Sequence, residues 1–157
     1  MKNIQLGRWV LTILLAPVFG AIGVILWSLS MANPTQSLVQ AVMNADAAQA
    51  KSLVEGGASL EEVDLDGQTP LLIAAMTDQF TIAEYLIAQG ANIFATSEFG
   101  WTVGYAAETS RLVRGPEAEA RQRVLVQLRD RGFPFPATKP RQVMKWVEEK
   151  HWPPAGH

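Results

Sequence analysis

The chain has 157 residues, no cysteine and a formal net charge of −2. This length has room for one modest domain beside a targeting segment. Without cysteine, disulfides, thiolate nucleophiles and cysteine metal sites are excluded. The two histidines, His151 and His157, both lie near the C-terminus, so a histidine-based catalytic or metal site would have to be built at a chain end.

Charge is divided unevenly along the chain. Residues 33–110 hold one base and ten acids, a net charge of −9, and residues 111–157 hold ten bases and five acids, a net charge of +5. The acidic part is either a solvated surface or a face that steers a partner protein of basic character. Nucleic acid is disfavoured as a ligand, because phosphate binding needs a basic surface over most of its footprint.

The first expected element is a membrane-spanning helix from Trp9 to Leu29, a stretch without a charged residue. It is long enough to cross a hydrocarbon core of about 30 Å. Lys2 and Arg8 precede it, and the positive-inside rule then places the N-terminus in the cytoplasm. We therefore expect a single-pass protein of the inner (cell) membrane, anchored through residues 9–29, with the rest of the chain in the periplasm.

Two other interpretations of this segment stay open. Ser30-Met31-Ala32 places small residues before Asn33, as the cleavage site of a signal peptide does. The apolar run, however, is longer than the ~7–15 residues of a signal-peptide core. The remaining alternative is a helix buried inside a soluble protein.

The next elements repeat at a spacing of 33 residues. Gly57-Ala58 recurs as Gly90-Ala91, Gly67 recurs as Gly100, and Thr69 recurs as Thr102. The segment 64–96 resembles an ankyrin repeat, and the matching residues are Gly67, Thr69-Pro70-Leu71, Ala74-Ala75, Leu86-Ile87 and Gly90-Ala91-Asn92. The resemblance implies an all-α fold, a short ankyrin-repeat solenoid of helix pairs joined by hairpin loops, here preceded by one transmembrane helix.

Each matching residue has a physical role in such a unit. Thr69 can cap the first helix, and Pro70 suits its first turn because the missing N–H is no loss there. Ala74 and Ala75 let neighbouring helices approach closely. Gly90 can adopt a positive φ and end the second helix. The apolar stripe of the second helix consists of Ile82, Leu86 and Ile87.

The two flanking repeats match less well. The first, about 36–63, lacks Thr-Pro-Leu, as an N-terminal capping repeat does. The third, 97 to about 135, has Val103 where proline is usual and Gly104 where leucine is usual. Gly132 lies 42 residues after Gly90, so about nine residues are inserted, and we place them at 111–116 between the two helices.

The C-terminal part begins with the proline-punctuated, non-helical segment 133–140. A helix at 141–151 is expected to close the stack, and the tail from Trp152 is expected to be loose. The domains are then 1–32, a cytoplasmic stub with a transmembrane signal anchor; 33–135, the ankyrin repeats; and 136–157, a C-terminal cap helix and tail.

The resemblance also implies a recognition surface, because ankyrin domains bind proteins through hairpin tips and the exposed side of the first helices. On this chain that surface consists of Leu65, Asp66, Gln68, Met76, Thr77, Glu98, Phe99, Trp101, Thr109 and Ser110. Phe99 and Trp101 would be aromatic anchors of the interface. The alternative for each ring is that it folds back over the neighbouring repeat.

No catalytic site is expected. Paired carboxylates such as Asp64 and Asp66 lie on a hairpin without an apolar pocket that would raise a pKa. They also lack the spacing of a calcium loop. The sequence therefore predicts a protein-binding adaptor or scaffold with no cofactor, metal or small-molecule substrate. An immunity protein against a toxin delivered to the periplasm, or an accessory factor for an envelope enzyme, are the alternatives.

Overall fold

The computed structural model describes residues 37–154. The chain divides into two units, 1–36 and 37–157, and the second is described here. The predicted membrane segment, 9–29, lies outside the described residues. Within the described part, no helix has both the length and the apolar character that crossing a bilayer requires.

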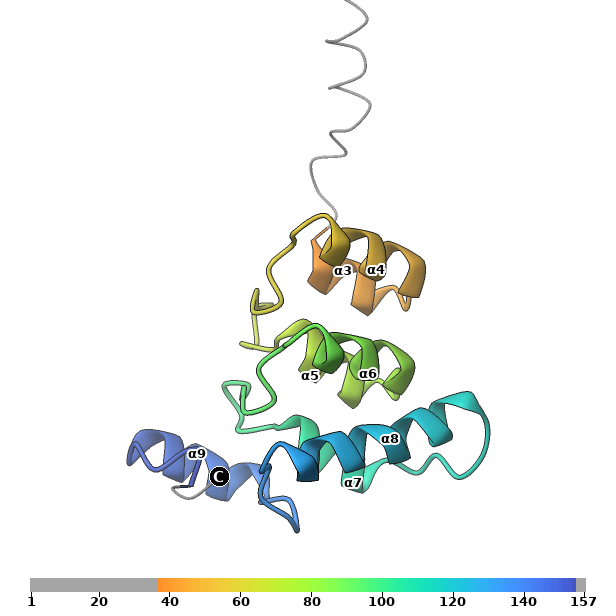
Figure 1. Cartoon of the computed structure of the whole chain (residues 1–157). Coiled ribbons are helices and arrows are strands. Elements are labelled where there is room, and N and C mark those ends of the chain that lie inside the picture. The colour runs from red at the N-terminus through yellow and green to blue at the C-terminus, as the bar shows by residue number, and fades with distance from the viewer. Residues whose placement is uncertain (1–36, 155–157) are drawn as a thin grey trace, which may run out of the picture. The chain divides into compact units, whose positions relative to one another are not determined.

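The described residues form seven helices, and their one extended pairing is an isolated bridge between Thr96 and Thr102. Three helix pairs lie one above another (Figure 1), which confirms the predicted all-α repeat stack. The helices are α3 (Leu38–Met43) with α4 (Ala47–Glu55), α5 (Pro70–Met76) with α6 (Phe80–Ala88), α7 (Val103–Thr109) with α8 (Pro116–Asp130), and then α9 (Pro140–Glu148).

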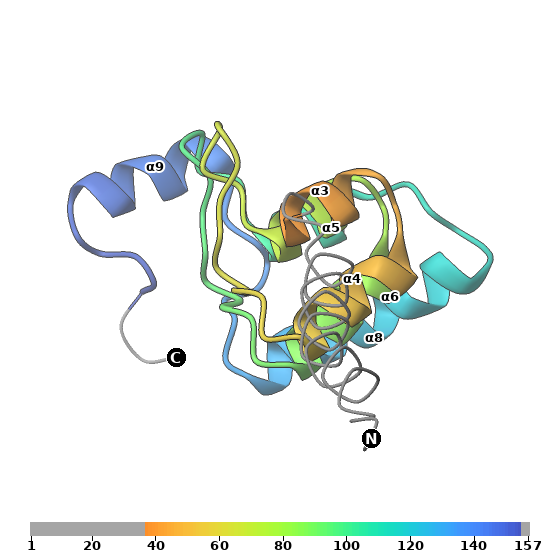
Figure 2. The ribbon, with the colours of Figure 1, turned by 90° about the horizontal axis from the view of Figure 1, so that it is seen from above.

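The helices form two layers, with hairpin loops projecting from one side (Figure 2). The inner layer consists of α3, α5 and α7, in which α5 contacts both neighbours, and in the outer layer α6 packs against α8. Ala74 and Ala75 of α5 are fully buried between the inner helices, as expected from their small size. The expected stripe on α6 (Ile82, Leu86 and Ile87) is also buried and belongs to one continuous core.

Three inner helices begin in the same way. The hydroxyls of Ser37, Thr69 and Thr102 each accept a hydrogen bond from the backbone N–H three residues later, at 3.1, 3.4 and 3.2 Å. This satisfies an amide that would otherwise lack a partner at the helix start. The predicted cap at Thr69 is confirmed, and so is the positive φ of Gly90, which is 95°.

The insertion in the third repeat lies mostly elsewhere than expected. The loop 110–115 has six residues where 77–79 has three, and α8 has 15 residues where α6 has 9. The placement of all nine residues at 111–116 is therefore wrong, because most of them lengthen α8 at its N-terminal end. A helix absorbs added residues with all their backbone hydrogen bonds made, which an irregular loop does not.

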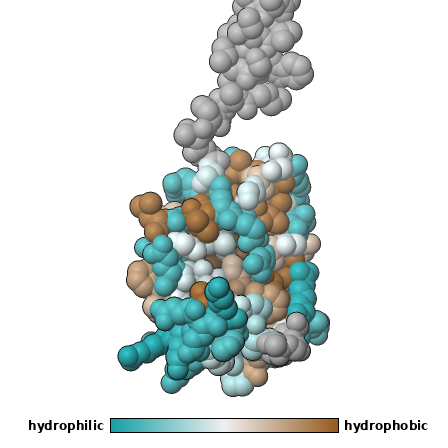
Figure 3. All heavy atoms as spheres, turned by 90° about the vertical axis from the view of Figure 1, so that its left-hand side faces the viewer, coloured by the Kyte–Doolittle hydropathy of each residue, from teal (hydrophilic) through white to brown (hydrophobic). Residues whose placement is uncertain are grey.

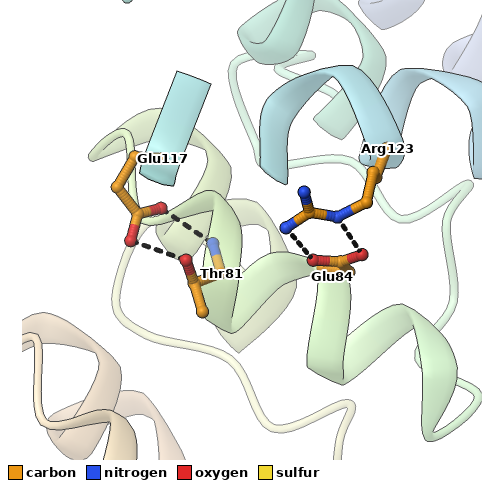
Figure 4. Close-up of polar contacts among 4 residues, drawn as sticks. All are labelled: Thr81, Glu84, Glu117 and Arg123. Atoms are coloured by element: carbon orange, nitrogen blue, oxygen red, sulfur yellow. Dashed lines mark hydrogen bonds and ion pairs between the residues drawn. The ribbon is translucent and has the colours of Figure 1, made fainter. Parts of the chain in front are cut away.

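The added turn of α8 supplies a cap to another repeat (Figure 4). The N-cap residue of α6, Gln79, makes no capping bond from its side chain. Glu117 of α8 accepts hydrogen bonds from the Thr81 amide and hydroxyl instead, at 2.7 and 2.8 Å. Its negative charge also suits the positive end of the α6 dipole.

Six residues further along α8, Arg123 makes a two-pronged contact with Glu84 of α6 at 2.7 and 2.9 Å (Figure 4). The hydrogen bonds that Arg123 donates to the Glu84 carboxylate raise the pKa of the Arg123 guanidinium above its ordinary value. The pair lies at the surface, so its contribution to stability is small. It adds a second polar contact between α8 and α6.

Aromatic side chains cover the last helix pair. An ideal Cβ on Gly104 would overlap the Phe133 ring, so this ring occupies the space in which repeats of this type usually place a leucine. Phe133 stacks on Phe94 with ring centroids 5.8 Å apart. Trp152 packs edge-on against Phe133 at 6.1 Å, and its indole N–H donates to the Phe94 carbonyl at 2.8 Å. The expectation of a loose tail is wrong for Trp152, because its ring and its N–H both have partners.

The helix expected at 141–151 is present as α9, and its contacts lie at the hairpin side of the stack. An ideal Cβ on Gly100 would meet the Pro140 carbonyl and Met144. Gly100 has a φ of 75°, so both its backbone conformation and this close approach require glycine. Of the side chains on α9, Val143 is fully buried. The helix therefore closes the row of hairpins. The helix layers are covered instead by the aromatic rings in contact with Phe133, which are those of Phe94, Phe135 and Trp152.

Candidate protein-binding groove

The inner helices α5 and α7 leave a hollow of about 340 Å³ between them. Its lining residues come from the ends of both helices and from the hairpin before α7. They are Ala75, Met76, Asp78, Trp101, Ala106, Thr109, Ser110 and Arg111. We call this hollow the inner groove.

The shape of the inner groove follows from small residues beside one large ring. Ala75 and Ala106 are buried and contribute only methyl groups. Trp101 is half-buried and packs edge-on against Tyr105, with ring centroids 5.2 Å apart and an interplanar angle of 65°. The contact with Tyr105 therefore holds the indole in place at the groove, so that little further side-chain entropy is lost when a partner binds.

The polar end of the groove is internally hydrogen-bonded. The Ser110 hydroxyl donates to Asp78 at 2.6 Å, joining the end of α7 to the end of α5. Arg121 of α8 donates to the Ser110 carbonyl at 2.7 Å. Thr77 and Thr109 donate their hydroxyls to carbonyls of their own helices, both at 2.7 Å. These polar groups are preorganised, so binding a ligand requires little rearrangement.

The hairpin tips form a second surface beside the groove. Leu65 is 100% exposed and Phe99 is 55% exposed. The two tips are tied together because the Glu98 amide donates to the Asp66 carbonyl at 3.1 Å. Gln68 is half-buried behind the tip of its hairpin, and its backbone N–H donates to the Asp64 carboxylate at 2.8 Å.

The ten predicted residues therefore divide into three sets. Met76, Trp101, Thr109 and Ser110 come together around the inner groove. Leu65, Asp66, Glu98 and Phe99 lie exposed on the tips, and the fold-back alternative does not hold for Phe99. Thr77 is exposed at the end of α5, and Gln68 supports a hairpin.

The ten predicted residues do not include two charged residues of the groove, Asp78 and Arg111. Each directly follows a predicted residue, Thr77 or Ser110, at the end of an inner helix. A prediction extended by one residue past each helix end would have included both. Asp78 has a φ of 60°, which turns the chain back after α5 and places the carboxylate at the groove.

Most acids of residues 33–110 are used inside the fold. The Asp64 carboxylate accepts hydrogen bonds from the backbone N–H groups of Asp66 and Gln68 at 2.9 and 2.8 Å and so shapes its hairpin. Eight of the ten acids have such a partner: Asp46, Glu55, Glu61, Glu62, Asp64, Asp78, Glu84 and Glu108. Among the described residues, only Asp66 and Glu98 of this set keep carboxylates without an internal partner.

A stack of helix pairs with hairpins on one side and a hollow between its inner helices defines a repeat protein of the solenoid class. The sequence model described as "Ankyrin repeats (3 copies)" matches residues 35–113, just over half of the chain, and the chain belongs to this ankyrin-repeat family. The match ends in the loop before α8. No curated protein matches the chain. Ankyrin repeats bind other proteins, so the coarse function is a protein–protein interaction module.

Proposed function

We propose that the protein is a membrane-tethered adaptor or scaffold that binds one partner protein across the inner groove and the hairpin tips. The observation that carries the proposal is the inner groove itself. An apolar side chain of the partner would enter between Ala75 and Ala106 and lie against Trp101. A buried anchor residue of this kind supplies most of the affinity in protein interfaces.

The tether is proposed from the charge-free segment 9–29 and the two bases that precede it. In this arrangement the repeats face the periplasm. A reporter that is active only outside the cytoplasm, fused after residue 157, should be active. A cytoplasmic reporter at the same position should be silent. The opposite pattern would contradict the proposed membrane topology and would leave the proposal for the inner groove untouched.

The remaining candidates are an immunity protein and an accessory factor for an envelope enzyme. An immunity protein would use the acidic part of the chain, residues 33–110, as a face complementary to a basic toxin. A hydrogen bond from an N–H or O–H group leaves the charge of a carboxylate in place, and only Glu55 and Glu84 of the ten acids pair with a base among the described residues. The acidic charge therefore suits any basic partner and does not single out a toxin. The adaptor, which requires no partner of a particular activity, is the function that we propose.

The test is a pull-down of the tagged full chain from cell envelopes, compared between wild type, Trp101→Ala and Phe99→Ala. We expect one stoichiometric partner whose recovery falls at least about tenfold in each variant, since anchor residues contribute about 2 kcal/mol or more. Val126→Ala removes an exposed apolar side chain on α8, outside the groove, and is the control.

A partner recovered equally by wild type and both variants would place the binding surface elsewhere. Thermal unfolding of each variant separates lost contact from lost fold. Phe99→Ala should leave the midpoint nearly unchanged because the ring is exposed. Trp101→Ala should lower it slightly, because the ring also packs on Tyr105.

A further inference from the structure

The hairpin row of this protein ends on a helix. Gly67 of one hairpin lies close to Glu98 of the next, since an ideal Cβ on Gly67 would be 3.1 Å from the Glu98 side chain. Gly100 meets Pro140 and Met144 of α9 in the corresponding way. The start of α9 therefore occupies the place in the row where a further hairpin would lie.

This arrangement forms a cleft of about 140 Å³ between the hairpin and α9. The volume is that of several water molecules, which suits one long side chain. The cleft is lined by Thr96, Ser97, Glu98, Gly100, Met144, Val147 and Glu148.

The floor of the cleft is apolar and partly exposed. Met144 is 37% exposed and Val147 is 44% exposed, so this side of α9 faces solvent in the described chain. Phe99 and Leu65, on the hairpin tips, are exposed apolar side chains as well. Figure 3 shows this side of the molecule, on which hydrophobic residues stand among hydrophilic ones.

The rim of the cleft is negatively charged. Glu98 is one of the two acids of residues 33–110 whose carboxylate has no internal partner. Glu148 likewise has none among the described residues, whereas its neighbour Glu149 pairs with Lys145 at 3.7 Å. The cleft therefore combines an apolar floor with two carboxylates that form no ion pair or hydrogen bond with the described residues.

We propose that this cleft binds a lysine or arginine side chain of the partner protein. The aliphatic stem lies on Met144 and Val147, and the cationic head group reaches Glu98 and Glu148. Long basic side chains combine these two requirements, and a hydrogen bond between opposite charges is among the strong ones. The inference rests on the proposed function and names the partner's chemistry: a basic residue beside an apolar one.

The test selects ligands for the full chain from a displayed library of random dodecapeptides and measures their affinities by fluorescence anisotropy. Selected peptides should carry lysine or arginine next to an apolar residue. Glu98→Gln with Glu148→Gln should weaken binding at least about tenfold, because two charge-assisted contacts are lost. Glu55→Gln with Asp130→Asn removes the same charge from two exposed positions on α4 and α8 and should leave affinity unchanged.

A second measurement locates the contact. Replacing the peptide's basic residue by methionine should weaken binding to the wild type but have no further effect on the Glu98/Glu148 double variant. Val147→Ser should also weaken binding, because it removes apolar surface from the floor of the cleft.

Peptides that bind the double variant as tightly as the wild type overturn the cleft proposal. If Trp101→Ala still abolishes their binding, the proposed function stands without the cleft. A library that yields no ligand at all counts against both.

Discussion

The Phe133 ring lies directly against Gly104, and the two residues are 29 positions apart in the sequence. The glycine leaves room in α7 that the phenylalanine ring fills. Two effects of opposite sign therefore meet at residue 104. Alanine is favoured over glycine inside a helix by about 1 kcal/mol, and an added methyl in a filled core costs about 1–3 kcal/mol.

We predict that Gly104→Ala destabilises the wild type and stabilises a Phe133→Ala background. The overlap is decisive in the first case, and helix propensity is decisive once the ring is gone. Urea unfolding of residues 37–157 in a double-mutant cycle gives the sign directly. A destabilisation of the same size in both backgrounds would mean that the ring does not occupy this space.

The contrast between Thr69 and Phe133 shows what the sequence reveals at this scale. The Thr69 cap, the Pro70 start and the Gly90 turn involve neighbours in the chain, and a local motif predicts all three. Phe133 lies in the segment after α8 and packs against Gly104 of α7, and nothing beside it in the sequence indicates this. Gly104 was visible as a departure from the family pattern, but its compensating partner was not.

At the scale of elements, α8 differs from α4 and α6 because it is longer, and its added residues have a structural role. Glu117 lies in the added turn and caps α6, whose own N-cap residue does not. Sequence spacing revealed the nine-residue insertion. It could not distinguish a longer loop from a longer helix, because Pro116 is equally suited to a loop and to the first turn of a helix.

We predict that Glu117→Ala lowers the free energy of unfolding by about 1 kcal/mol, the usual cost of a lost helix cap. Glu119→Ala, two residues further along the same helix, removes an exposed carboxylate without such a bond and should change it by less than about 0.5 kcal/mol. Urea midpoints of both variants measure the difference. Equal effects would show that net charge, not capping, is responsible.

For the whole molecule, the predicted repeat stack and its order were correct, because a 33-residue period fixes both. The predicted role of the C-terminal part was correct only in that a helix forms. α9 closes the hairpin row, and the Trp152 indole closes the helix layers through Phe94 and Phe133. These contacts span 58 and 19 positions of sequence. A tail rich in proline gives no local sign of such docking.

We predict that Trp152→Ala lowers the free energy of unfolding by about 2 kcal/mol, through lost apolar burial. Trp152→Phe keeps a ring and loses the N–H, and should cost about 1 kcal/mol. His151→Ala, at a neighbouring exposed position, is the control. Intrinsic fluorescence during urea unfolding gives the midpoint of each of the three variants. An unchanged midpoint in Trp152→Ala would mean that the tail is loose, as the sequence predicted.

The ring of Phe133 over Gly104 also limits how this protein can grow. Solenoids lengthen over evolution by duplicating a unit, and each new copy must stack on an open helix surface. The surface after α8 is already taken by aromatic residues of the chain's own C-terminal segment. A duplicated unit could therefore be accepted before the third repeat but not after it, and the length of this solenoid is fixed from its C-terminal end.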